Sequence, residues 1–468
     1  MRGTGEGELA IVLHTHMPYV EGFGTWPFGE EWLWEAVATS YLPLLRLFEQ
    51  HGAQRIREQL TLSLTPVLCD QLEAPGAVER CIAFLRDIRP ASHQLDIDEF
   101  AQQHDTAAVS ELNRSAAEYA AAAALLERMH KQDGGILGAL GAHATWTSAA
   151  SHPILPLLAL DESATLQIGT GIRSARERFG EWGGGFWLPE CAHAPWLNPL
   201  LLEAGVRVSC VELTRHFGLG DRRHLAPLRE HDGPTLVPID RATMALAWGE
   251  RSYQFRDAYR SYRRRTPRDH HVHANDGSPY DRDRAGAQAR ADAAEFVTAV
   301  RERVSDGGLC VAAFDTEHLG HWWYEGPLWL EAVLAEAPRR GLRLTALDEA
   351  ALERHPAGTS ALPQSDTSWG AGGDLRTWSA PAVADLAWQA RSAELHAFTS
   401  DRIQLTPRAA RELLALQSSD WAFLAYFDWS GDYPRQRASG HAAQLARALR
   451  GETEEPHVRN LAPYLSYS

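Results

Sequence analysis

Short apolar runs recur along residues 1–350, and most of them are followed by a segment of helical or irregular pattern. Runs rich in Val, Ile, Leu and Phe and bounded by turn residues are typical of buried strands. The helical segments between them, such as Ser110–Lys131 and Asp292–Val304, repeat Ala and Leu with a period of about 3.6 residues. The runs predict eight strands: Leu9–Leu13, Gln59–Leu64, Ile136–Leu140, Gly185–Leu188, Arg207–Val211, Leu236–Ile239, Cys310–Phe314 and Leu342–Ala346. Strands that alternate with helices predict an α/β fold in which a parallel sheet forms a barrel or a distorted barrel.

The pattern changes after Ala346. A stretch rich in Gly, Ser and Pro, His355–Gly373, indicates a long connection. The region Asp385–Arg450 is helical in period and has no convincing strand. We therefore expect a barrel over residues 1–350 with a helical insertion near 75–131, a connection over 351–384, and a C-terminal all-helical domain over 385–468.

Composition narrows the range of partners. A net charge of −16 argues against nucleic-acid binding, which needs a basic face. No run approaches the ~20 apolar residues of a membrane helix, and the N-terminal residues do not resemble a signal peptide, so a cytoplasmic protein without a membrane contact is expected. The five cysteines form no C-x-x-C pair and are expected to be reduced and buried. Sixteen tryptophans favour a neutral partner such as a sugar, whose ring stacks on an indole.

Polar residues immediately after predicted strands are candidates for chemistry, because the loops at the carboxyl ends of barrel strands build the active site. His14 and His16 are two residues apart, which places both imidazoles on the same face of an extended strand. The full set comes from four segments, "HTHMPYV", "GAHATWTSAASHP", "GGGFWLPECAH" and "AAFDTEHLGHWWYEGP", and comprises His14, His16, His143, His152, Glu190 and Asp315.

Two carboxylates delivered to one end of a barrel suit the cleavage of a glycosidic bond. One protonates the leaving oxygen while the other attacks the anomeric carbon or activates a water. Other interpretations stay open. Either acid taken singly fits a helix cap or a solvated loop, the histidine pair fits a hydrogen-bonded core position, and H-x-H with Asp315 and His318 fits a metal site. Trp322 and Trp323 also fit a core position.

Five ordered segments resemble family 57 glycoside hydrolases: "HTHMPYV", "FWLPECA", "FDTEHLGHWWYEGP", "SWGAGGDLRTW" and "SSDWAFL". The last two favour the 1,4-α-glucan branching enzyme group of that family. Trp32–Leu45 and Leu60–Leu68 are similar to its members as well. The resemblance extends from residue 9 to about residue 430, and it implies a distorted (β/α)7 barrel with inserted helical segments and a C-terminal helical domain.

The resemblance also implies a retaining mechanism and the roles of individual residues. Glu190 matches the nucleophile and Asp315 the general acid and base, with an expected separation of about 5–5.5 Å between the carboxyl groups. Further positions match residues that line the site or the glucan groove: His14, His16, His152, Trp32, Trp248, Trp369, Trp378, Asp420 and Trp421. No metal or organic cofactor is implied, and the expected partners are α-1,4-glucan donor and acceptor chains.

The sequence departs from the family pattern in the loop that covers the site. Branching members carry a tyrosine at the tip of a loop after the nucleophile region, and this chain has no tyrosine between Arg207 and Arg241. Either another residue shields the intermediate or hydrolysis is favoured. His193 replaces another usual tyrosine, and the histidine-rich segment before Tyr280 fits either a solvated basic loop or an altered acceptor site.

These departures leave alternatives to the branching enzyme. Within the family they are an α-amylase-like hydrolase and a 4-α-glucanotransferase. From other classes they are a metal-dependent polysaccharide deacetylase, which a metal between His14, His16 and Asp315 would support, and a catalytically silent glucan-binding protein. The presence of both carboxylates argues against the silent protein.

Overall fold

A curved, mostly parallel sheet forms the centre of the computed structural model, which describes residues 7–22, 24, 28–229, 233–358, 362–399, 405–452 and 458–467. The strand order is β6-β7-β5-β4-β3-β2-β1-β8, with β9 also paired to β1. Every pair is parallel except β6 with β7. The strands are β1 (Gly7–Thr15), β2 (Leu60–Leu64), β3 (Ala144–Ser148), β4 (Gly185–Trp187), β5 (Val208–Val211), β6 (Leu228–Arg229), β7 (Thr235–Pro238), β8 (Gly308–Asp315) and β9 (Arg343–Leu344).

The two ends of this sheet approach each other. The backbone N–H of Asp240, just after β7, donates to the carbonyl of Val311 in β8 across 2.8 Å. Seven parallel strands, β1 to β5 with β7 and β8, thus curve into an incomplete barrel. The predicted α/β class and distorted barrel are confirmed.

Seven of the eight predicted strands overlap observed strands, but Ile136–Leu140 was wrong because it lies in a helix. Gly134 begins that helix with a left-handed backbone, φ 78°, and the apolar residues at helical spacing point into the core. The true third strand is β3, "ATWTS", in which the hydroxyls of Thr147 and Ser148 are buried and hydrogen-bonded: Ser148 Oγ donates to the carbonyl of Trp187 across 2.8 Å. A short apolar run does not by itself distinguish strand from helix.

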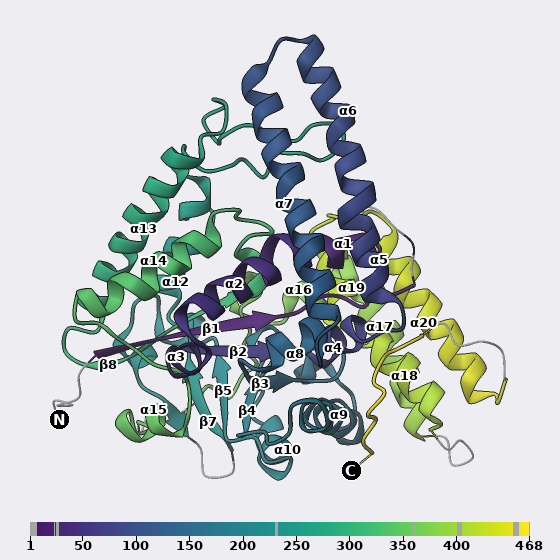
Figure 1. Cartoon of the computed structure of the whole chain (residues 1–468). Coiled ribbons are helices and arrows are strands. Elements are labelled where there is room, and N and C mark those ends of the chain that lie inside the picture. The colour runs from purple at the N-terminus through teal and green to yellow at the C-terminus, as the bar shows by residue number, and fades with distance from the viewer. Residues whose placement is uncertain are drawn as a thin grey trace.

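Helices surround the sheet (Figure 1). The α6–α7 hairpin projects away from the sheet, while α13 and α14 lie on one side and α17, α18 and α20 on the other. The helices are α1 (Glu30–Ala36), α2 (Leu42–His51), α3 (Ala53–Gln59), α4 (Pro66–Leu72), α5 (Ala77–Ala83), α6 (Arg89–Gln102), α7 (Thr106–His130), α8 (Gly135–Gly141), α9 (Asp161–Phe179), α10 (Leu197–Glu203), α11 (Thr214–Phe217), α12 (Arg241–Ala247), α13 (Arg282–Arg303), α14 (Gly326–Arg339), α15 (Glu349–Arg354), α16 (Arg376–Ser379), α17 (Ala384–Thr399), α18 (Pro407–Leu416), α19 (Ser419–Tyr426) and α20 (Tyr433–Leu449). Among the described residues, no helix is both long enough and apolar enough to cross a membrane.

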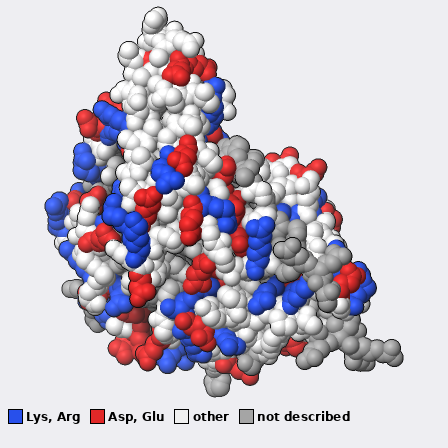
Figure 2. Space-filling model, turned by 45° about the vertical axis from the view of Figure 1, so that its right-hand side comes forward, with Lys and Arg blue, Asp and Glu red and all other residues white. Residues whose placement is uncertain are grey.

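The projecting hairpin is a long α7 paired with α6, and its surface mixes acidic and basic side chains (Figure 2). Asp105 caps α7 by accepting a hydrogen bond from the N–H of Ala108 across 2.9 Å. The histidine-rich segment before Tyr280 packs against this hairpin: His270 is buried and its Nδ1 lies 2.5 Å from Asp96 Oδ2 of α6. This contact gives His270 a structural role rather than that of a solvated basic residue.

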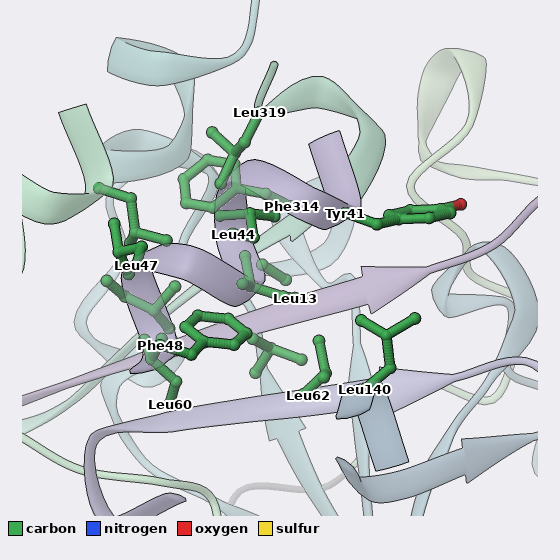
Figure 3. Close-up of a cluster of buried hydrophobic side chains, with 14 of the residues drawn as sticks. Leu13, Tyr41, Leu44, Leu47, Phe48, Leu60, Leu62, Leu140, Phe314 and Leu319 are labelled. Carbon is green, nitrogen blue, oxygen red and sulfur yellow. The ribbon is translucent and has the colours of Figure 1, made fainter. Parts of the chain in front are cut away.

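Large apolar side chains from the sheet and from α2 form the main core (Figure 3). Leu13 of β1, Leu62 of β2 and Phe314 of β8 meet Leu44 and Phe48 of α2. Burying one such side chain contributes about 1.5–3 kcal/mol, so the packing of α2 fixes the strands β1, β2 and β8 relative to one another. All five cysteines are buried and unpaired.

The C-terminal helices α17 to α20 have an apolar core of their own and also contact the barrel. Ser418 forms an isolated bridge with Pro153, and the N–H of Ser419 donates to the carbonyl of His152 across 3.0 Å. This contact places the start of α19 at the carboxyl ends of the strands. The expected domain boundaries at residues 351 and 385 stay predictions, and residues 359–361, 400–404, 453–457 and 468 lie outside the described residues.

Candidate active site

The carboxyl ends of the strands carry the predicted site residues to one edge of the sheet. β1 and β8 pair so that His14 is opposite Asp315. Glu190 lies in the turn after β4, and His152 lies in the loop after β3. Both Glu190 and His152 have a left-handed backbone with φ 59°, which non-glycine residues adopt rarely and which clusters at functional sites. The surrounding structure therefore holds these two side chains in place against backbone strain.

Three predicted histidines form a stacked group. The Nε2 atoms of His14 and His152 lie 3.0 Å apart, and the rings of His16 and His152 stack with centroids 4.0 Å apart. His14 also stacks on Trp187, with centroids 4.8 Å apart. Burial, followed by the charge of His16, lowers the pKa of His14 and His152 well below the usual value. These two imidazoles are therefore neutral at pH 7 and suited to hydrogen bonds with uncharged hydroxyl groups.

Glu190 is held by a tryptophan from a distant part of the chain. The indole Nε1–H of Trp369 donates to Glu190 Oε2 across 2.6 Å, and the backbone N–H of Trp369 donates to the carbonyl of Glu190 across 3.0 Å. The Nδ1 atom of His152 lies 3.9 Å from Glu190 Oε1. Burial and then the charge of Asp315 raise the pKa of Glu190 to about 8, while the hydrogen bond from Trp369 opposes this rise.

Two acidic side chains lie near Asp315. Burial, followed by the charges of Glu317 and Asp420, raises its pKa well above the usual value. Glu317 is itself buried, and its Oε1 accepts hydrogen bonds from the Tyr41 hydroxyl at 2.5 Å and from the His16 backbone N–H at 3.2 Å. Burial raises the pKa of Glu317 to about 8. Burial and the charges of Glu317 and Asp420 thus favour a proton on Asp315.

The aromatic positions divide into two groups. Trp369 lies between Trp187, at 5.1 Å between ring centroids, and Trp248, at 5.2 Å edge to face. Trp248 in turn stacks on His318 at 5.7 Å. These rings form a wall beside Glu190.

Among the described residues, no ring contact joins the other predicted tryptophans to this wall. Trp32 in α1 is half-buried and packs edge-on against Phe28 at 6.1 Å. Trp378 and Trp421 are buried in the C-terminal core, where Trp421 Nε1 donates to the carbonyl of Ala415 across 2.8 Å. By contrast Asp420, the neighbour of Trp421, reaches the site: its Oδ1 lies 3.1 Å from His16 Nε2.

Residues that the sequence did not single out complete the surroundings of Glu190. Arg241, just after β7, donates to the carbonyl of Trp369 at 2.5 Å and pairs with Glu212, just after β5, at 2.8 Å. This chain of contacts orients Trp369 and through it the Glu190 carboxyl. Glu212 and Arg241 come within two residues of the ends of predicted strands. The same signal pointed to Glu190 and Asp315, so the sequence could have identified Glu212 and Arg241 as well.

Two predicted histidine positions have structural contacts instead. His143 lies before β3, at the opposite end of that strand from the site, and its ring packs on Phe48 at 5.0 Å. The prediction that His143 is a site residue was wrong, because it assumed a third strand at Ile136–Leu140, which would have placed His143 after the strand. His193 is buried, with Nε2 2.8 Å from Asn198 Oδ1 and its backbone paired with Thr367.

The described residues contain one group with metal-ligand spacing: His16, His152 and Asp420 each offer an atom within 4.8 Å of the others. It differs from the group suggested by the sequence, which included Asp315 and His318. His318 Nε2 is instead 3.0 Å from the carbonyl of Ala247. The rings of His16 and His152 are stacked face to face, so their ring nitrogens lie side by side rather than converging on one point.

The loop after β5 contains the predicted tyrosine-free segment. Arg215 pairs with Asp374 at 2.6 Å, which fastens α11 to the turn beyond Trp369. Phe217 packs under Arg223 at 4.2 Å, and Leu219 at the following turn is 68% exposed. Residues 230–232 of this loop lie outside the described residues.

Most of the chain matches a single family of known sequences. The model of glycosyl hydrolase family 57 matches residues 10–362, which include both Glu190 and Asp315. The chain belongs to glycosyl hydrolase family 57. A second model, described as 1,4-alpha-glucan branching enzyme, C-terminal, matches residues 385–461 of this family 57 enzyme, where α17 to α20 lie. The family resemblance drawn from the five segments is confirmed.

Named relatives extend over nearly the whole family 57 chain. A probable 1,4-alpha-glucan branching enzyme of Mycobacterium tuberculosis is 31% identical over 95% of this chain and 92% of its own. A 1,4-alpha-glucan branching enzyme of Thermococcus kodakarensis is 30% identical over 94% of this chain and 73% of its own. The crystal structure of a family 57 branching enzyme from Pyrococcus horikoshii, 29% identical, covers 96% of this chain and 92% of its own with a TM-score of 0.83. An α-amylase from Thermotoga maritima, 20% identical, shares the fold with a TM-score of 0.75 and covers 96% of this chain and 95% of its own.

Proposed function

We propose that this family 57 enzyme is a 1,4-α-glucan branching enzyme that cleaves α-1,4 links and transfers the released chain to form α-1,6 branches in a glycogen-type polymer. The observation that carries the proposal is the pair of half-buried carboxyl groups, Glu190 and Asp315, with different hydrogen-bond surroundings. The branching-enzyme relatives and the C-terminal match at residues 385–461 support the choice of reaction.

The surroundings of the two carboxyl groups support different roles. Glu190 accepts a hydrogen bond from Trp369, which favours its ionised form, so it is suited to be the nucleophile. Among the described residues, no hydrogen bond to the Asp315 side chain opposes burial and the charges of Glu317 and Asp420, all of which favour its protonated form, so it is suited to be the acid. Both groups border the same histidines: Asp315 is opposite His14 in the sheet, and Glu190 lies 3.9 Å from His152, whose ring contacts His14 at 3.0 Å. The separation of about 5–5.5 Å expected for a retaining pair stays a prediction.

The reaction then has two steps. In the first, Glu190 attacks the anomeric carbon of an α-1,4-linked glucosyl unit, while Asp315 gives its proton to the departing chain oxygen, and a covalent β-glucosyl enzyme forms. In the second, Asp315 takes the proton of a 6-hydroxyl of another glucan chain, whose oxygen displaces Glu190 and forms the α-1,6 branch. The neutral His14 and His152 are placed to hydrogen-bond sugar hydroxyls during both steps.

The balance between transfer and hydrolysis depends on which acceptor reaches the intermediate. Branching needs a bound glucan chain and few water molecules near the Glu190 ester. The loop after β5 offers Phe217 and the exposed Leu219 rather than a tyrosine. This observation favours an α-amylase-like hydrolase as the second candidate function, with a 4-α-glucanotransferase as a third product pattern.

One assay separates these reactions. The protein is incubated with amylose, the product is treated with an α-1,6-specific debranching enzyme, and newly released short chains are compared with newly formed reducing ends. We expect more branch-derived chains than reducing ends. Reducing ends without branches would support the hydrolase, and new α-1,4 chain lengths without either would support the glucanotransferase. Glu190→Gln should abolish all of them. Activity that survives this change, or that a metal chelator removes, would contradict the carboxylate mechanism.

A further inference from the structure

A π-helical turn, Val37–Tyr41, joins α1 to α2. Backbone hydrogen bonds in a π-helix span five residues, and such turns are rare in proteins but frequent at functional sites. This turn packs against the segment Thr316–His318, which directly follows Asp315. Ser40 Oγ donates to the carbonyl of Thr316 across 2.8 Å. The turn therefore fixes the backbone immediately beyond the proposed general acid.

Tyr41 ends this turn, and its side chain is fully buried. Figure 3 shows its ring beside the apolar side chains that join α2 to the sheet, with the hydroxyl group turned away from them. The hydroxyl donates to Glu317 Oε1 across 2.5 Å, and the backbone N–H of His16 donates to the same oxygen across 3.2 Å. Burial raises the pKa of Glu317 to about 8, and both hydrogen bonds oppose this rise. Two separate elements thus supply donors that favour the ionised form of Glu317.

Asp315 lies two residues before Glu317 and differs from it in hydrogen bonding. Among the described residues, no hydrogen bond reaches the Asp315 side chain, and burial, followed by the charges of Glu317 and Asp420, raises its pKa well above the usual value. When two neighbouring acids interact, the acid that has hydrogen-bond donors ionises first as pH rises, and its charge then holds the proton on the other acid. In this pair, Glu317 is the acid that has the donors.

The other titratable groups around Glu317 keep one charge state or face other partners. Burial, followed by the charge of Glu317, raises the pKa of Tyr41 well above the usual value, so this hydroxyl keeps its proton and stays a donor. Burial raises the pKa of the Cys69 thiol in α4 to about 12, so this group is neutral below that pH. The His16 imidazole faces Asp420, with Nε2 3.1 Å from Oδ1, and it is the backbone of His16 that contacts Glu317. Among the described residues, the hydroxyl of Tyr41 is therefore the one side-chain donor to Glu317.

We propose that Tyr41 is a positioning residue for the general acid: its hydroxyl holds Glu317 ionised, so the proton of the acid pair stays on Asp315. The π-helical turn brings Tyr41 to this place, because Ser40 within the turn is fixed to the carbonyl of Thr316. Tyr41 acts on Asp315 through Glu317 and takes no part in the bond changes. The role of Asp315 as the acid rests on the proposed function, whereas the order in which the two acids ionise does not.

Tyr41→Phe tests the role of the hydroxyl, because it keeps the buried ring. The first measurement does not depend on catalysis: the free energy of unfolding in denaturant is compared between a chain with Asp315 and the same chain with Asp315→Asn, over about pH 5 to pH 10. The aspartate loses stability relative to asparagine as pH rises above its ordinary pKa, and this difference becomes constant once Asp315 ionises in the folded protein. In the Tyr41→Phe background it should become constant at a pH lower by about one unit, the scale on which neighbouring acids couple. The second measurement is the alkaline limb of kcat/KM on amylose, which should move to lower pH by the same amount.

Tyr259→Phe is the matched control, because Tyr259 is also fully buried and donates to a buried carboxylate, Asp292 Oδ2, across 2.6 Å. This control should move neither the unfolding difference nor the limb. Glu317→Gln alone should reproduce the shift, and adding Tyr41→Phe to it should cause no further shift, because residue 317 can then no longer ionise. Melting curves verify that each variant folds.

An unfolding difference that becomes constant at the same or a higher pH in Tyr41→Phe would overturn the proposal, whatever the activity. Equal shifts in Tyr41→Phe and Tyr259→Phe, or a further shift when Tyr41→Phe is added to Glu317→Gln, would also overturn it. A shift of the unfolding difference without a shift of the kcat/KM limb would support the effect of Tyr41 on the acid pair and refute Asp315 as the acid. The same shift in a protein that forms no α-glucan product would support that effect and refute the proposed reaction.

Discussion

The hydrogen bond from Trp369 to Glu190, the proposed nucleophile, influences the pH at which this carboxyl group ionises, and Trp369→Phe tests this influence. Phenylalanine keeps an aromatic ring between Trp187 and Trp248, which contact Trp369 at 5.1 and 5.2 Å, and removes the N–H donor together with one ring of the indole. The donor stabilises the carboxylate form, so its loss raises the pKa of Glu190 further above the value of about 8.

The expected size of the effect follows from the bond. A hydrogen bond to a charged group contributes about 1.5–3 kcal/mol, and about 1.4 kcal/mol corresponds to one pH unit. The acidic limb of the kcat/KM profile should therefore move to higher pH by about one to two units, because kcat/KM reports the ionisation of the free enzyme. At pH 7, below this limb, kcat/KM on amylose should fall by about ten- to hundred-fold.

The assay is a pH series of initial rates with amylose, from about pH 5 to pH 10, for the wild type and the variant. Trp182→Phe is the control, because the Trp182 indole also donates a hydrogen bond, 2.8 Å long, but to the carbonyl of Gly185 at the start of β4. Its acidic limb should not move. If Trp369→Phe lowered the rate equally at every pH and left the limb in place, Trp369 would act through its ring contacts, and the reasoning from the hydrogen bond would be refuted.

Three further predictions follow from buried charges. Glu190→Gln should raise the melting temperature at pH 8 and leave it nearly unchanged at pH 4. The pKa of Glu190 is about 8 in the folded protein against an ordinary 4.5, so the wild type loses up to a few kcal/mol of stability as pH rises from 4.5 to 8. Calorimetry in which the difference between variant and wild type does not depend on pH would contradict this. Glu317→Gln removes a like charge beside Asp315, so the pKa of Asp315 should fall and the alkaline limb of the kcat/KM profile should move to lower pH. An alkaline limb that stays in place or moves to higher pH would contradict a charge effect of Glu317. Arg178→Met leaves the buried Asp70, which Arg178 contacts at 2.7 Å, without this ionic partner, and should lower the free energy of unfolding in denaturant by about 3–5 kcal/mol. A second change in the same chain, Asp70→Asn, should restore most of this loss. Equal stabilities of the single and double variants would refute the pairing.

Much of the barrel could be predicted because its strands are buried on both faces. Such strands read as continuous apolar runs, and "LAIVL" and "CVAAF", which turn residues bound, are runs of this kind. The third strand was missed because it is polar: Ser148 Oγ donates to the carbonyl of Trp187 in β4, and Thr147 Oγ1 donates to the carbonyl of Gly171 in α9. A polar strand becomes stable only when those partners are in place, so the sequence pattern of that segment alone does not reveal it.

The sequence alone determined which residues stand at the carboxyl ends of the strands. His14, His16, Glu190 and Asp315 follow apolar runs directly, and parallel pairing takes all such positions to one edge of the sheet. The position of a polar residue after an apolar run is a property of each segment, and the common edge follows from the rule that the carboxyl ends of parallel strands lie on one side of the sheet. Family motifs added the expected role of each carboxyl group.

Only the tertiary structure decided how these groups differ from each other. Trp369 donates to Glu190 from 179 positions away, and Asp420 contacts His16 from 404 positions away. Burial and the charges of Glu317 and Asp420 protect the proton of Asp315. No spacing in the sequence encodes these contacts, because hydrogen bonding, desolvation and charge interaction act over a few ångströms of space, whatever the length of chain between the partners.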